Sequence, residues 1–324
     1  PCSWPCCSAG RCGPGCFEAE LGVYSESMKI TGLHLLLTYQ CNFKCEHCFV
    51  WGGPDQYGTM TLNTVREILR QAQDTGTVEW IYFEGGEPFL YYAVLQRGVE
   101  MAAQAGFKVG IVSNAYWATD KEDALACLSP FAGTVQDLSI SSDAYHWNDA
   151  DDHRTRVAQA AAQELGIPLD VISIAPPEAT HAACSQGQIA AGESAVVFRG
   201  RAAQRLTARA DKHGCEQFTE CPFEDLREPG RVHLDPLGNV HICQGITMGN
   251  LLQQPLRELF DRYDPAHHPV TGPLLDGGPA ELLRRYDLPC RGKYCDACHL
   301  CDTVRRALRP RFPEVLAPDQ MYGE

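Results

Sequence analysis

From residue 31 onward, short apolar runs alternate with amphipathic stretches, and loops or glycines separate them. This alternation is typical of strands followed by helices, the repeating unit of α/β proteins. The clearest predicted helix spans residues 62–75, where Val65, Ile68 and Ala72 share one face and Gly76 offers a C-terminal stop. Strands are predicted at residues 33–37, 79–83, 108–113, 137–141, 169–174 and 194–198.

Six strands with helical crossovers form either a doubly wound parallel sheet or a partial barrel. In both folds, ligands bind at the carboxyl ends of the strands. Polar or unusual residues follow each of the first four predicted strands, so we expect them to gather at one rim. They are Cys41, Cys45 and Cys48; Gly85, Gly86, Glu87 and Pro88; Ser113 and Asn114; and Ser141, Asp143, Tyr145 and His146.

Beyond residue 205 the strand and helix rhythm fades, and residues 211–324 are rich in Cys, Pro, Gly and Arg. A hairpin is predicted at residues 235–239, where Pro, Gly and Asn stand between short apolar runs. We expect three parts: a Cys-rich N-terminal segment (1–28), a barrel (29–205) and a smaller domain (206–324). Metal rather than a deep apolar core is expected to hold the smaller domain together.

Composition narrows the class of protein. The chain has 324 residues, of which 44% are hydrophobic, so it can bury a large core. Its formal charge of −14 argues against nucleic acid or an anionic membrane as a partner. Neither a run of roughly 20 apolar residues nor a signal peptide is evident, so a soluble, cytoplasmic protein is expected.

The chain contains 17 cysteines, an odd number that is awkward for a purely disulfide-bonded protein. They are grouped: five lie within residues 2–16, three within 41–48, three within 215–243 and four within 290–301. Short-range groups without an export signal favour metal ligation in a reducing compartment. The N-terminal group, Cys2, Cys6, Cys7, Cys12 and Cys16, is not assigned to any pattern, and Cys127 and Cys184 stand alone, Cys184 near the predicted rim.

The spacing C-x3-C-x2-C at Cys41, Cys45 and Cys48 supplies three thiolates and leaves a fourth metal position open, as sites for chemistry do. With Gly-Gly-Glu-Pro after the next strand, the chain resembles the radical S-adenosylmethionine enzymes over roughly residues 31–200. A zinc site completed by a distant residue is the alternative. Zinc would not explain Gly-Gly-Glu-Pro at the next strand end.

The resemblance implies a partial (β/α)6 barrel with a [4Fe–4S] cluster on the three cysteines and S-adenosylmethionine on the fourth iron. It implies that Gly85, Gly86, Glu87 and Pro88 contact the methionine amino group, and that His47 lies near the adenine. It also suggests ribose and methionine contacts at the ends of two further strands. The residues expected there are Ser113, Asn114, Ser141 and Asp143.

The C-terminal region resembles the auxiliary-cluster domains called SPASM and twitch, through Cys221, the run from Gly238 to Cys243, and Gly249-Asn250. One or two auxiliary iron–sulfur clusters are therefore expected. Zinc at the last four cysteines is the alternative. The candidate ligands are Cys215, Cys221, Cys243, Cys290, Cys295, Cys298 and Cys301.

These resemblances predict an enzyme that cleaves S-adenosylmethionine to a 5′-deoxyadenosyl radical and oxidises or crosslinks a peptide or protein side chain. A flavodoxin- or ferredoxin-type protein is the expected electron donor. A small metabolite is the alternative substrate, because residues 1–28 are too few for a winged-helix leader-binding domain. A non-catalytic iron–sulfur or metal-binding protein is the alternative from another class.

Overall fold

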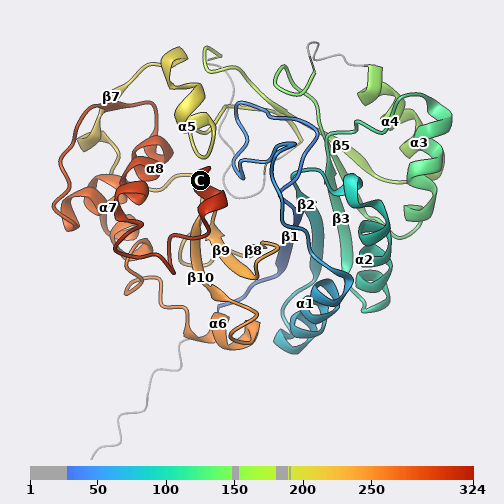
Figure 1. Ribbon diagram of the computed structural model, residues 1–324, viewed down its shortest axis with the longest axis horizontal. Helices are drawn as coiled ribbons and strands as arrows, with labels where there is room; N and C mark the ends of the chain where they lie inside the picture. Colours follow the sequence, from blue (N-terminus) through green and yellow to red (C-terminus); the bar gives the residue numbers. More distant parts are fainter. Residues whose placement is uncertain (1–27, 148–152, 180–188, 190) are drawn as a thin grey trace, which may run out of the picture.

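The computed structural model describes residues 28–147, 153–179, 189 and 191–324, and its centre is one curved, mostly parallel sheet (Figure 1). In the described residues this sheet has nine strands in the order β10-β9-β8-β1-β2-β3-β4-β5-β6. The six strands from β1 to β6 run parallel in chain order, which confirms the predicted partial barrel. Their bounds are β1 Gly32–Thr38, β2 Trp80–Gly85, β3 Lys108–Ser113, β4 Asp137–Ser141, β5 Leu169–Ile174 and β6 Gly192–Ser194.

Only the sixth predicted strand is clearly displaced. The apolar run at 194–198 suggested a strand there, whereas β6 ends at Ser194. Val196 and Phe198 instead bury their side chains in a small cluster with Ile174, Ala202 and Leu206. Their hydrophobicity therefore reflects packing beyond the sheet edge, which a single sequence does not distinguish from a buried strand.

Helices cover the outer face of the parallel strands (Figure 1). The predicted helix at 62–75 is confirmed: Thr61 caps its first turn and Gly76 ends it in the left-handed region, with φ of 72°. No helix within the described ranges is long and apolar enough to cross a membrane. The covering helices are α1 Leu62–Thr75, α2 Tyr92–Gln104, α3 Lys121–Leu128 and α4 His153–Leu165.

The C-terminal region extends the sheet of the barrel. The hairpin predicted at 235–239 joins β8 (Arg231–Leu234) to β9 (Asn239–Cys243), and β8 pairs in parallel with β1. β10 (Ile246–Asn250) continues the sheet, and the remaining elements pack beside it. They are α5 Ala202–Arg205, α6 Leu256–Arg262, α7 Thr271–Arg285, α8 Ala297–Leu308, and the short pair β7 His213–Gly214 and β11 Lys293–Tyr294.

The expectation that this region lacks an apolar core is wrong. Ile242, Leu274, Leu282, Leu300 and Val304 are all fully or almost fully buried in one cluster. That cluster also takes in Leu36 of β1, so it is continuous with the barrel interior. Apolar burial therefore stabilises residues 206–324 even before any metal is considered.

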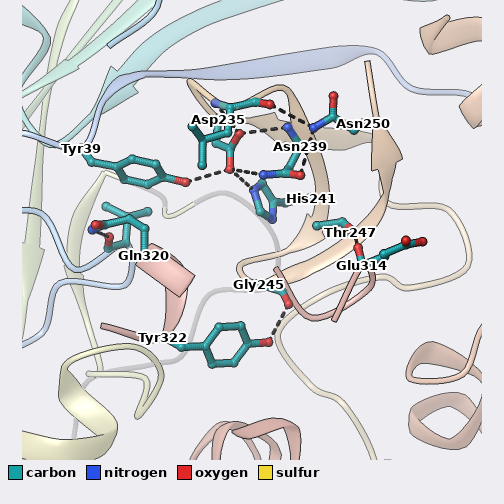
Figure 2. A network of polar contacts seen from close by, with 12 residues as sticks. Tyr39, Asp235, Asn239, His241, Gly245, Thr247, Asn250, Glu314, Gln320 and Tyr322 are labelled. Atoms are coloured by element: carbon teal, nitrogen blue, oxygen red, sulfur yellow. Dashed lines mark hydrogen bonds and ion pairs between the residues drawn. The ribbon is translucent and has the colours of Figure 1, made fainter. Parts of the chain in front are cut away.

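A buried polar network fastens the hairpin to the segment that follows β1 (Figure 2). The Asp235 carboxylate accepts hydrogen bonds from the Tyr39 hydroxyl at 2.9 Å and from the Asn239 amide at 2.8 Å, and the His241 ring lies 3.1 Å away. Asp235 and His241 are fully buried. Because buried polar groups are costly to leave unpaired, this network fixes the hairpin next to the cysteine loop that begins at Cys41.

Candidate active site

The loop after β1 carries the three cysteines, and backbone amides point at two of their sulfurs. The Phe43 amide lies 3.3 Å from the Cys41 sulfur, and the Gly52 amide lies 3.2 Å from the Cys48 sulfur. Cys41 and Cys45 are buried, whereas Cys48 is half-buried. Amide donors stabilise negative charge on sulfur, so the loop is suited to hold thiolates.

Arg201 fixes the shape of this loop from the other side of the barrel. Its guanidinium donates to the carbonyl oxygens of Cys45 and Gly52, both at 2.7 Å, and its own amide donates to the Cys48 carbonyl at 3.0 Å. The residue is only 4% exposed. Sequence reasoning missed this role of Arg201, because the contact spans about 150 residues of chain.

Gly85 and Gly86 are required by their contact with the start of the cysteine loop. A Cβ on Gly85 would lie 2.4 Å from the Thr38 carbonyl oxygen, and one on Gly86 would lie 2.1 Å from that of Gln40. The Gly86 and Glu87 amides donate to these same two oxygens at 2.7 and 2.9 Å. The two glycines therefore let the turn after β2 pack directly on the segment that positions Cys41.

Glu87 is fully buried and organises the end of β3. Its carboxylate accepts hydrogen bonds from the Ser113 hydroxyl at 2.9 Å, the Asn114 amide at 2.7 Å and the Phe89 amide at 3.0 Å. Burial raises the pKa of Glu87 to about 7, although these hydrogen bonds act in the opposite direction. Pro88 is buried beside it as the first residue of a 3₁₀ turn.

Asn114 links this carboxylate to the cysteine loop. Its side-chain amide donates to Asn42 at 2.9 Å and lies 3.7 Å from the Cys41 sulfur. The predicted residues after β1, β2 and β3 are thus joined in one hydrogen-bonded chain, as expected for the carboxyl ends of neighbouring parallel strands.

His47 and Asp143 lie close together beside the cysteine loop. Asp143 is buried and accepts hydrogen bonds from the amides of Tyr145 and His146 and from the His146 ring. Burial lowers the pKa of His47 to about 4, despite the Asp143 carboxylate 3.7 Å away. The neutral His47 ring stacks on Tyr145 with centroids 4.6 Å apart.

These side chains surround one cavity of about 210 Å³. Most of the predicted cluster and cofactor residues line it, whereas Glu87 and Pro88 lie behind its wall. The cavity continues inward to Arg199, Arg231, His34, Glu84 and His233. The lining residues from the prediction are Cys41, Cys45, Cys48, His47, Gly85, Gly86, Ser113, Asn114, Ser141 and Asp143.

The cavity fits a cluster and a polar cofactor better than a zinc ion. Tetrahedral zinc holds its sulfur ligands about 3.8 Å apart. In the described chain, the groups of three potential ligands whose atoms all lie within 4.8 Å do not include the cysteine triplet. Burial also raises the pKa of the Cys41 thiol to about 12, so a thiolate there requires a cationic partner. His47 Nδ1 is buried without a hydrogen-bond partner and is available to a ligand.

A second group of cysteines lies around a smaller cavity in the C-terminal region. Cys221, Cys243, Cys298 and Cys301 all line it, together with Arg199 and Arg305. Burial raises the pKa of the Cys301 thiol to about 11, and the nearby Cys243 contributes to that rise. The two arginines supply positive charge beside these four sulfurs, and Arg199 lines both cavities.

The other C-terminal cysteines lie apart from this group, which differs from their prediction as metal ligands. Cys215 and Cys290 are joined in a disulfide, so their sulfurs are not thiolates that could ligate a metal. The Cys295 sulfur lies 3.7 Å from the Thr207 carbonyl oxygen and does not line the smaller cavity. Cys184 and the N-terminal group of five cysteines lie outside the described residues.

Sequence reasoning missed several polar residues on the inner wall. Arg199 and Arg231 share the Glu224 carboxylate at 2.9 and 3.3 Å, and His34 and His233 flank Glu84. A signal was present for His34, because a histidine inside the apolar run of β1 is unusual. The others depend on contacts between distant segments, which a single sequence does not specify.

Comparisons with known proteins agree with this site. A model of the radical SAM superfamily matches residues 35–146. The chain is 29% identical over 111 residues to a putative peptide biosynthesis protein, YydG, of Bacillus subtilis, covering 34% of this chain and 35% of YydG. It is 33% identical over 84 residues to an S-adenosylmethionine-dependent nucleotide dehydratase of Selenomonas ruminantium, covering 25% of this chain and 29% of that protein.

The fold also resembles that of Streptococcus suis SuiB bound to the precursor peptide SuiA. The TM-score is 0.52 at 14% identity, and the match covers 74% of this chain and 66% of SuiB. At this identity the likeness concerns the fold alone, and the curated relatives match over about a third of their length. The radical SAM superfamily model thus matches about a third of this chain, the part that contains the cysteine loop and most of the first four strands of the parallel barrel.

Proposed function

We propose that Cys41, Cys45 and Cys48 hold a [4Fe–4S] cluster and that S-adenosylmethionine binds in the adjoining cavity. The observation that carries this proposal is the hydrogen-bonded chain from Glu87 through Asn114 to Cys41, which joins the Gly-Gly-Glu-Pro turn to the cysteine loop. When bound, these groups supply a 5′-deoxyadenosyl radical that removes a hydrogen atom from a substrate. A protein that only carries electrons would need no such cavity beside its cysteines.

The chain's own residues would then position the cofactor and exclude water. The amides of Phe43 and Gly52 stabilise the thiolate charge, and Arg201 holds the loop in one conformation. The neutral His47 ring offers its unpartnered Nδ1 and an aromatic face to an adenine. These buried contacts support a preorganised site.

We further propose that Cys221, Cys243, Cys298 and Cys301 hold one auxiliary [4Fe–4S] cluster. Four cysteines would ligate all four irons, so no iron would remain for direct substrate binding. The function that fits such a cluster is to accept the electron that the substrate radical releases. An oxidative modification, in which the substrate loses a hydrogen atom and then an electron, is therefore favoured.

We propose a peptide or protein side chain as the substrate. The similarity to YydG, whose name refers to peptide biosynthesis, supports this class, and SuiB shares the fold. A small metabolite is the second candidate, because the match to the nucleotide dehydratase has a slightly higher identity over a shorter segment. A radical enzyme of either class would use a flavodoxin- or ferredoxin-type donor.

The test uses anaerobically purified, cluster-loaded protein with S-adenosylmethionine and a strong reductant. The unaltered protein should form 5′-deoxyadenosine, and Cys45→Ala should form none. Exchange of both Cys215 and Cys290 for Ser, which removes a disulfide but no proposed cluster ligand, serves as the control and should preserve formation. A cluster-loaded, unaltered protein that makes no 5′-deoxyadenosine would contradict the proposal.

A further inference from the structure

Three polar side chains meet on the inner face of the barrel, deeper than the cysteine loop. They come from three adjacent strands: His34 from β1, Glu84 from β2 and His233 from β8. His34 pairs with His233 in the parallel register of β1 and β8, and Glu84 pairs with Leu36, two residues along β1 from His34. Because alternate residues of a strand share a face, the register places all three on the same side of the sheet.

Polar side chains are unusual at this place because β1 is buried on both of its faces. Leu33, Leu35 and Leu37 pack in the core beneath the helices, so both faces of the strand are buried. His34, Glu84 and His233 are 4%, 9% and 4% exposed, and all three line the large cavity. A buried carboxylate with two histidines, in a site shielded from bulk water, needs partners that satisfy every lone pair.

The protein alone does not satisfy them. His34 Nδ1 lies 3.2 Å from one oxygen of Glu84 in hydrogen-bond geometry. His233 Nε2 forms an ion-pair contact with the other oxygen at 3.1 Å, but this oxygen has no hydrogen bond of good geometry in the described structure, and His233 Nδ1 is buried without a partner. This oxygen of Glu84 therefore lies close to a histidine nitrogen and still has capacity for a further ligand.

The spacing of the three ligand atoms fits a metal ion. One nitrogen from each histidine and one carboxylate oxygen all lie within 4.8 Å of one another. Ligands at about 2.1 Å from a metal lie roughly 3.0 to 3.4 Å apart in octahedral or tetrahedral geometry. Each histidine nitrogen lies at such a distance from one oxygen of Glu84, His34 Nδ1 at 3.2 Å from one oxygen and His233 Nε2 at 3.1 Å from the other. Tyr82 stacks on His34 at 4.6 Å between centroids and restricts the rotation of that ring.

We propose that His34, Glu84 and His233 bind one divalent transition-metal ion of the Zn²⁺, Mn²⁺ or Fe²⁺ class, with its remaining coordination positions open to the cavity. Two imidazoles and one carboxylate are a ligand set used by such ions when they keep open positions. A substrate carbonyl, carboxylate or hydroxyl group is the kind of ligand that would occupy those positions. This site is separate from the cysteine loop, and the proposal does not depend on radical chemistry.

A second group, His47, Asp143 and His146, also has atoms within 4.8 Å of one another. It adjoins Cys48 and belongs to the site already described. Its carboxylate is more fully engaged, because Asp143 accepts hydrogen bonds from three backbone amides as well as from His146. Within the part of the chain that the structure describes, no backbone amide donates to the Glu84 carboxylate, so Glu84 is the carboxylate with capacity for a cation.

The test measures metal binding directly in the cluster-loaded, full-length protein without S-adenosylmethionine. Mn²⁺ is titrated anaerobically, and the free ion is followed by electron paramagnetic resonance. The unaltered protein should bind about one Mn²⁺ per chain, and Glu84→Gln should bind it at least tenfold more weakly. His267→Ala, which alters an exposed histidine paired with Asp264, is the matched control and should bind normally.

Two further measurements distinguish the loss of a metal ligand from the loss of the fold. His233→Gln is a second variant, and the thermal midpoint and cluster absorbance of each variant report whether it is folded. Pulsed electron paramagnetic resonance of bound Mn²⁺ should detect coupling to two histidine nitrogens, and one of them should vanish in His233→Gln. Equal Mn²⁺ binding by the folded Glu84→Gln variant, or a bound ion without nitrogen coupling, would overturn the proposal.

Discussion

The guanidinium of Arg201 lies 2.7 Å from the carbonyl oxygen of Cys45, so a residue beyond the last barrel strand holds the loop that follows the first. Arg201 makes a second contact of the same length with Gly52. The planar guanidinium reaches both oxygens at once, which a lysine ammonium does not reproduce.

We expect Arg201→Lys to destabilise the cysteine loop by about 2 to 4 kcal/mol, because buried hydrogen-bond acceptors would lose a charged donor. Thermal unfolding and iron content per chain measure the effect, and both should fall. Arg205→Lys, an exposed change within the adjoining helix α5, should alter neither. Normal iron loading in Arg201→Lys would show that the loop does not need this contact.

Gly86→Ala tests the close packing of the turn after β2. The new Cβ would lie 2.1 Å from the Gln40 carbonyl oxygen and 2.8 Å from that of Tyr39, so backbone must move. We expect a loss of about 3 kcal/mol or more in the free energy of unfolding. Gly292→Ala has no atom within 4 Å of its new Cβ and should be nearly neutral in the same denaturation experiment.

Glu87→Gln tests the effect of pH. Glu87 has a pKa of about 7 in the fold, above its ordinary value of 4.5. Between these values the folded protein holds a proton that the unfolded chain has lost, so the Glu87 contribution to stability falls as pH rises from 4.5 to 7. The stability of Glu87→Gln relative to the unaltered protein should therefore increase by on the order of 2 kcal/mol between pH 5 and 8.

Thermal unfolding at a series of pH values measures this difference. Glu122→Gln, at an exposed position in the first turn of α3, is the control for losing one carboxylate. A relative stability of Glu87→Gln that stays constant across the range would mean that Glu87 titrates alike in the folded and unfolded chains.

The proposal that only Cys221, Cys243, Cys298 and Cys301 hold the auxiliary cluster predicts the iron content of two double variants. With both proposed clusters loaded, the protein should contain about eight irons per chain, and the double change of Cys221 and Cys298 to Ala should leave about four. The double change of Cys215 and Cys290 to Ser should leave about eight, because these two form a disulfide. Iron analysis and electron paramagnetic resonance measure both, and iron loss in the serine variant would contradict that proposal.

The barrel and its rim could be predicted because their signals are local. The cysteine loop, the Gly-Gly-Glu-Pro turn and Ser113-Asn114 each follow a strand directly, and parallel strands bring such ends together. Helix α1 was predicted with its bounds because periodicity, Thr61 and Gly76 all agree within one segment.

The remaining features depend on contacts between distant segments. Nothing in the spacing of the C-terminal cysteines separates Cys298, which faces Cys221, from Cys295, which packs near Thr207. Similarly, His34 and His233 meet only because β8 pairs with β1 across about 200 residues. These pairings are decided by the free edge of β1 and by shared apolar burial, which one sequence does not reveal.

Arg199 lines both cavities, and Glu224 holds its guanidinium between them. Two cavities that share a lining residue adjoin each other, so charges bound in them interact, and thermodynamic coupling between sites is reciprocal. With the proposed cluster on the four cysteines, an anion in the larger cavity would change the energy of adding an electron to that cluster. Reduction of the cluster would change the affinity for the anion by the same factor. Under the proposed function, substrate binding and reduction of the auxiliary cluster would therefore change each other by the same free energy.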